Sequence, residues 1–92
     1  MNSNQEHRLT SEEVRTFIVT VVSPLVDHPD AITVAVKPGE RFTDYALQVD
    51  PRDIGAVIGH HGQVAQAIRT VVYSVRTNDH RRVRLLIMDE NM

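Results

Sequence analysis

The spacing of apolar residues changes three times along the chain, and this order of periodicities limits the folds open to it. Apolar residues first recur at helical spacing between residues 14 and 25, and then alternate with polar residues over 31–37 and 42–49. Helical spacing returns over residues 51–76, and alternation returns over 82–88. The pattern predicts an α+β domain with the order α-β-β-α-α-β.

Capping and turn residues support these boundaries. Thr10 and Glu13 have the spacing of a capping box ahead of the first helix. Pro24 removes a backbone donor and predicts that the last turn of this helix is kinked or tightened. Asp50 followed by Pro51 is typical of a helix start. The next helix is expected to run over residues 63–76.

The predicted order also indicates a topology. The second strand, two helices and third strand form a crossover, which is expected to be right-handed and to place its helices on one face of the sheet. We therefore expect a two-layer sandwich in which three helices cover one face of a three-stranded sheet. The predicted core consists of Phe17, Ile18, Val21, Val34, Leu47, Ile58, Ile68, Val72, Leu85 and Ile87.

Length and composition indicate one small domain. The 92 residues are 41% hydrophobic, which suits a single core, and we expect a flexible N-terminus over residues 1–9 and one domain over 10–90. There is no cysteine, so disulfide and thiolate chemistry are excluded. No signal peptide or bilayer-spanning apolar run is recognisable, which favours a cytoplasmic protein without membrane association. The formal net charge is -2, with a basic excess in residues 51–92.

The two middle helices are joined by Gly59, His60, His61 and Gly62. Glycine permits a positive φ and lets another backbone approach closely, and the free N–H groups opening a helix favour phosphate. A GxxG loop between two helices is the feature with which KH domains hold single-stranded nucleic acid. Apolar residues before the loop would support bases, and arginines would supply charge. The predicted RNA-binding residues are Ile54, Gly55, Val57, Ile58, Gly59, His60, His61, Gly62, Gln63, Arg69 and Arg84.

The segment from Asp53 to Gly62, followed by Ala67, Ile68 and Arg69, resembles the signature of a type II KH domain. With residues 24–26, 29–31, 72–75 and 82–85, the chain is similar to the KhpA family of small stand-alone bacterial KH proteins over about residues 12–89. The resemblance implies a cytoplasmic RNA-binding protein without catalysis or cofactor, acting as a post-transcriptional regulator or RNA chaperone. It also implies a homodimer, a KhpB (Jag/EloR)-type partner, and a link to control of cell elongation and division.

The loop differs from the family pattern in its charge. The family usually has basic side chains in and beside the loop, where this chain has Ala56, His60, His61 and Gln63. Lysine and arginine contacts to phosphate dominate the affinity for nucleic acid, so we expect weaker RNA binding at neutral pH. The alternative is a protein interaction module that uses the GxxG face for dimerisation or docking, with weak or no RNA binding.

Metal binding and catalysis are the other classes to consider. His60, His61 and His80 are potential zinc ligands, but adjacent loop histidines seldom converge on one ion and no cysteine assists them. The polar cluster at residues 27–30 has no nucleophile or phosphate loop near it in sequence. We therefore expect no metal site and no catalytic residue, and the protein is not expected to be an enzyme.

Overall fold

The computed structural model describes residues 8–78 and 80–88. Its helices and strands follow the predicted α-β-β-α-α-β order, which is confirmed. The elements are α1 (Ser11–Val22), β1 (Thr33–Pro38), β2 (Phe42–Gln48), α2 (Ile54–Ile58), α3 (Gln63–Val72) and β3 (Arg82–Ile87). Short 3-10 turns lie between them, namely η2 (Ser23–Leu25), η3 (Pro29–Ala31), η4 (Pro51–Asp53) and η5 (His60–Gly62).

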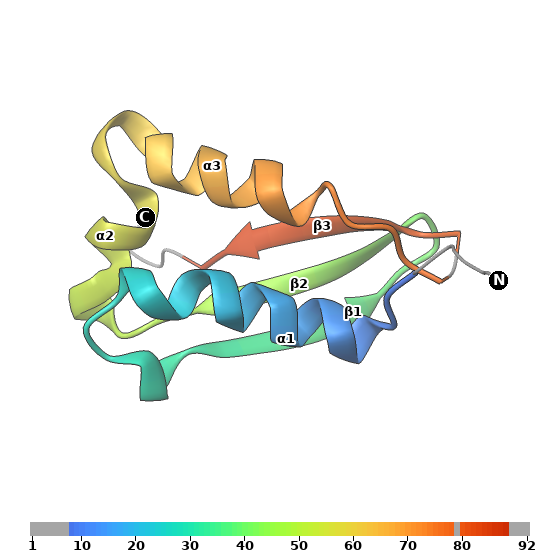
Figure 1. Ribbon diagram of the computed structural model, residues 1–92, viewed down its shortest axis with the longest axis horizontal. Helices are drawn as coiled ribbons and strands as arrows, with labels where there is room; N and C mark the ends of the chain where they lie inside the picture. The colour runs from blue at the N-terminus through green and yellow to red at the C-terminus, as the bar shows by residue number, and fades with distance from the viewer. Residues whose placement is uncertain (1–7, 79, 89–92) are drawn as a thin grey trace, which may run out of the picture.

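The three strands form one mixed sheet in the order β1-β2-β3. β1 pairs with β2 in antiparallel orientation, and β2 pairs with β3 in parallel. The long helices α1 and α3 lie on one face of this sheet, and α2 with the following loop lies at one end of the helical layer (Figure 1). The two-layer α+β arrangement expected from the sequence is confirmed.

Strand alternation separates an inner from an outer face of the sheet. On the inner face Val34 is paired with Leu47, and Tyr45 is paired with Leu85; these four side chains are buried under the helices. The outer face carries the alternate positions, including Phe42, Asp44 and Arg84.

The core lies between the sheet and the two long helices. Of the predicted core residues, Ile18, Val34, Leu47, Ile68, Val72 and Leu85 are buried, and Val21 and Ile87 are partly buried against them. The prediction was wrong for Phe17 and Ile58, which are only partly buried and lie outside this cluster. The cluster also contains Val14, Val22, Tyr45, Val49 and Val57.

The start and end of α1 follow the local sequence signals. The backbone N–H of Glu13 donates to the Thr10 hydroxyl at 3.1 Å, and the N–H of Thr10 donates to the Glu13 carboxylate at 2.9 Å. This is the predicted capping box. Pro24 lies in the 3-10 turn η2, so the prediction of a tightened last turn is also confirmed.

α3 and β1 are shorter than predicted. α3 ends at Val72 instead of continuing to residue 76, because the next residues form tighter turns in which the Ser74 hydroxyl donates to the Val71 carbonyl at 2.6 Å. The first strand begins at Thr33, since Ala31 belongs to η3. Just beyond α3, the Tyr73 hydroxyl accepts a hydrogen bond from the backbone N–H of Leu85 at 3.1 Å.

The end of the segment predicted to be flexible is held by the domain. The Leu9 N–H donates to the Arg76 carbonyl at 2.8 Å, and the Asn78 N–H donates to the Leu9 carbonyl at 3.0 Å. The Leu9 side chain also packs against the core. The expected flexible segment thus ends in a residue that is bonded to the domain, and residues 1–7 lie outside the described part of the chain.

Candidate nucleic-acid interface

The GxxG loop uses backbone conformations that favour glycine. Gly59 has φ 78°, Gly62 has φ 74°, and His61 between them has φ 56°. A Cβ atom on Gly59 would lie 2.4 Å from Cγ2 of Val64, so packing as well as φ requires glycine there. At Gly62 a Cβ would meet nothing within 4 Å, and this position therefore opens toward solvent.

The loop leaves few backbone donors free for a ligand. The N–H of Gly59 donates to the Gly55 carbonyl at 2.8 Å, and the N–H of Gly62 donates to the Gly59 carbonyl at 3.2 Å. The N–H of Gln63 donates to the His60 carbonyl. Within the part of the chain that the structure describes, the N–H groups of His60 and His61 make no such bond. These two adjacent amides are the donors that the loop leaves unused.

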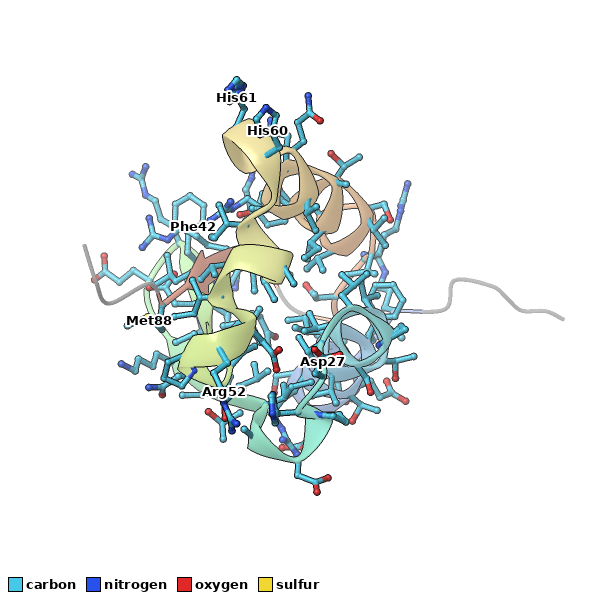
Figure 2. All side chains as sticks on the ribbon, turned by 90° about the vertical axis from the view of Figure 1, so that its left-hand side faces the viewer. Asp27, Phe42, Arg52, His60, His61 and Met88 are labelled. Carbon is cyan, nitrogen blue, oxygen red and sulfur yellow. The ribbon has the colours of Figure 1, made fainter. Side chains whose placement is uncertain are left out.

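The two histidines form the tip of this surface. Their side chains are exposed and project away from the rest of the molecule in Figure 2. The rings of His60 and His61 stack on each other, with centroids 4.0 Å apart and planes inclined by 18°. They offer hydrogen-bonding nitrogens and a flat ring face beside the free amides, but no permanent charge.

Helix α2 supplies the surface before the loop. Gly55 is exposed, and a Cβ there would meet nothing within 4 Å, so the packing of the protein does not demand glycine. Ile54 and Ile58 are partly buried and share this region. Val57 is fully buried at 0% exposure. Its side chain supports the core, and the predicted apolar floor under RNA bases is reduced to the two isoleucines.

The two predicted arginines lie in different places. Arg69 is on α3, about 10 Å along the helix from Gly62. Arg84 is on the outer face of the sheet, away from the helical layer that carries the loop, and its guanidinium binds the Asp44 carboxylate at 2.7 and 3.2 Å. The hydrogen bond from Arg84 is the main reason that the pKa of Asp44 lies below its usual value. The structure therefore does not bring Arg84 to the loop.

Asp53 positions α2 and was not among the predicted site residues. The residue is 3% exposed, and its carboxylate accepts hydrogen bonds from the backbone N–H groups of Asp27 at 3.2 Å and His28 at 2.9 Å. The Nδ1 atom of His28 lies 3.0 Å from the same carboxylate. Burial raises the pKa of Asp53, but the hydrogen bonds from Asp27 and His28 outweigh burial, and the pKa is lowered. The signal available in the sequence was an acidic residue directly before the short helix Ile54–Ile58.

Asp50 caps the same segment, as predicted. It accepts the backbone N–H of Arg52 at 2.9 Å, and the Arg52 guanidinium binds the carboxylate through Nε and Nη2, each at 2.9 Å. The side chain of Arg52 is the main cause of a strongly lowered Asp50 pKa. Arg52 is therefore engaged at the base of α2, far from the histidines of the loop (Figure 2).

Residues 8–78 and 80–88 contain neither a candidate metal site nor a candidate membrane span. In these segments no group of three or more His, Asp or Glu side chains could hold a metal ion. None of the helices described is both long and apolar enough to span a bilayer.

A helix, a GxxG loop and a second helix between two parallel neighbouring strands define a KH-type nucleic-acid-binding fold. The family model for the KhpA/KhpB KH domain matches residues 15–87. The chain therefore belongs to the KhpA/KhpB family of non-enzymatic KH domains, as the sequence resemblance predicted.

Curated relatives agree with this assignment. A protein of Lactiplantibacillus plantarum named RNA-binding protein KhpA is 53% identical over 77 residues, covering 84% of this chain and 91% of the relative. Proteins of the same name from Streptococcus pneumoniae and Listeria monocytogenes are 40% and 39% identical and cover 83% and 79% of this chain and 95% and 96% of the relatives. No solved structure matches the chain.

Proposed function

We propose that this protein binds single-stranded RNA through the GxxG loop and the adjoining face of α2. The adjacent N–H groups of His60 and His61 would hold a phosphate, and Ile54 and Ile58 would contact a base. The relatives named as RNA-binding proteins support this proposal. Family membership further supports a cytoplasmic role as a post-transcriptional regulator or RNA chaperone, with a KhpB-type partner and a connection to cell elongation and division.

The backbone conformation at Gly62 is the main observation in favour of RNA binding at the loop. Within the described segments, the N–H groups of His60 and His61 stay unbonded in a loop with positive φ at His61 and Gly62, next to a position where a Cβ would meet nothing within 4 Å. An anion there gains hydrogen bonds from amides that the domain itself does not use.

The test compares Gly62→Asp with Gly62→Asn. The two side chains have nearly the same shape and both tolerate positive φ better than most residues do. Only aspartate places a negative charge where the phosphate would lie, so Gly62→Asp should lower RNA affinity on the order of 10-fold or more relative to Gly62→Asn. Fluorescence anisotropy with a labelled single-stranded RNA measures this, and circular dichroism checks the fold. Equal affinities would remove the loop from the RNA site.

We further propose that a homodimer forms through an apolar groove that begins beside the loop. The groove has a volume of about 330 Å³ and lies between the end of α1 and α3. Leu25 and Val71 on its walls are 40% and 44% exposed, so apolar side chains meet solvent side by side in this groove. Its lining residues are Val21, Leu25, Gln63, Val64, Ala67, Ile68 and Val71.

A charge in the groove tests the dimer. Val71→Glu should shift sedimentation equilibrium toward the monomer, because burying an unpaired carboxylate in an apolar contact is unfavourable. Thr70→Glu is the matched control, since Thr70 is exposed next to Val71 but does not line the groove. A monomeric wild-type protein at high concentration, or equal dimerisation of both variants, would contradict this interface.

A further inference from the structure

The β1–β2 turn and the start of β3 lie at the end of the sheet opposite α2 and the GxxG loop (Figure 1). A cationic and aromatic surface lies at this end. It is formed where the turn between β1 and β2 meets the loop that precedes β3. The backbone N–H of Arg82 donates to the Arg41 carbonyl at 2.9 Å, and Nε of Arg81 donates to the Gly39 carbonyl. These bonds hold the two loops together. We call Arg41, Phe42, His80, Arg81 and Arg82 the turn-end patch.

The turn-end patch is hollowed. Two adjoining depressions of about 440 and 410 Å³ share Phe42 and Arg82 as lining residues. The first depression is completed by Tyr73, Val75, Thr77, Arg81 and Val83, and the second by Glu40, Arg41 and His80. Each has the concave shape that a nucleotide needs in order to lose much of its solvent contact.

The charge of this patch contrasts with that of the loop. Among the described residues that line the two depressions, Glu40 is the one carboxylate. Arg41 and Arg82 take part in no ion pair within the described segments, so their charges remain available to a ligand. The tip of the GxxG loop, by comparison, carries two histidines and no lysine or arginine. Permanent positive charge is therefore concentrated at the far end of the domain.

Phe42 is held in place within the patch. Cζ of Arg84 lies 4.5 Å from the centroid of the Phe42 ring, and Arg84 is itself fixed by its two bonds to Asp44. The remaining surface of the ring lines both depressions, and Tyr73 nearby is 46% exposed. Aromatic rings between arginines are the combination with which proteins bind single strands, since bases stack on the rings while cations follow the phosphates.

We infer that the turn-end patch is a second contact for single-stranded RNA, with Arg41 and Arg82 on phosphates and a base on Phe42. This inference rests on the proposed function, because the strand held at the loop would continue along α3 and pass the edge of β3, where Tyr73 and Val75 line the first depression, to reach the patch. α3 has 10 residues and spans about 15 Å. A KH loop clamps about four nucleotides. Only a longer RNA would therefore engage both sites.

The experiment measures the affinity of the full chain for single-stranded RNAs of ~4 and ~12 nucleotides, a range that covers the loop alone and an extended site. The Arg41→Gln, Arg82→Gln double variant should bind the long RNA on the order of 10-fold more weakly and leave the short RNA unchanged. The slope of log affinity against log salt for the long RNA should fall by about 0.7 for each arginine lost. Phe42→Leu should weaken binding of the long RNA about 5-fold or more, since a base loses its ring.

The control is Arg15→Gln, Arg52→Gln, which removes the same charge from α1 and from the base of α2. It should leave the preference of the protein for the long RNA intact. If wild type binds both lengths equally, or if the two double variants lose the same affinity, the turn-end patch is not an RNA site while the loop proposal stands. If wild type binds neither length, both proposals fail.

Discussion

At Gly55, the requirements of folding and of ligand binding can be told apart. It lies inside the short helix α2 without a positive φ and without a neighbour within 4 Å of a Cβ. Glycine inside a helix is less favourable than alanine by about 0.5–1 kcal/mol. The domain gains nothing in packing from this glycine, whereas a ligand backbone lying on α2 would gain a close approach.

Gly55→Ala is therefore expected to move stability and affinity in opposite directions. The free energy of unfolding should rise by about 0.5–1 kcal/mol, while RNA affinity falls because a methyl group stands on the binding surface. Urea denaturation and fluorescence anisotropy measure the two effects. Thr70→Ala, an exposed helix substitution on α3, should be stabilising without a change in affinity. A Gly55→Ala protein that binds RNA as well as wild type would show that α2 is not part of the RNA-binding surface.

At the scale of elements, Asp53 ties the beginning of α2 to the chain that leaves α1. The pKa of Asp53 in the folded protein is lowered, so folding favours its ionised form. Its contribution to stability is complete above the unfolded pKa of about 3.9 and is lost as pH falls through the lower folded value.

Asp53→Asn should therefore lower the melting temperature at pH 7, and the difference from wild type should shrink below about pH 4. RNA affinity should also fall at pH 7, because α2 and the loop lose their anchor to Asp27 and His28. Asp30→Asn is the control, since this exposed carboxylate lies in the same connection and has no described partner. If the difference in melting temperature does not change with pH, the charge of Asp53 is not the cause of the destabilisation.

The elements also show which features a sequence can reveal. The capping box at Thr10 and the helix start at Asp50 were predictable because each depends on residues two or three positions away. The burial of Val14 in place of Phe17 was not predictable, because it depends on how α1 is rotated against the sheet.

The candidate site likewise has features that the sequence predicts and features that it does not. The glycine spacing predicted the loop from Gly59 to Gly62, and the positive φ values there agree with this prediction. The pairing of Arg84 with Asp44 depends on strand register, and the anchoring of Asp53 joins residues 25 and 26 positions apart. Contacts between residues so far apart in the chain produce no periodic pattern in a single sequence.

For the whole molecule, stability depends on one small core shared by the sheet and two helices. Ile68 is 3% exposed and belongs to this core, so Ile68→Ala should reduce the free energy of unfolding by roughly 2–5 kcal/mol. Val71, one turn further along α3 and 44% exposed, gives the matched comparison. Val71→Ala should change stability by less than about 1 kcal/mol in urea denaturation. If both variants lose the same free energy of unfolding, Ile68 is not part of the core.

The hydrogen bond from Leu85 to the Tyr73 hydroxyl affects how copies of the molecule can meet. β3 is an edge strand, and an edge strand with open N–H groups recruits strands from other chains and promotes aggregation. Tyr73 occupies the donor at the middle of β3 and stands across that edge. A continuous sheet cannot extend from one molecule to the next at this position. Pairing of β3 with a strand of another molecule is thereby blocked at Leu85, and loss of the phenol ring would expose this donor to a neighbouring chain.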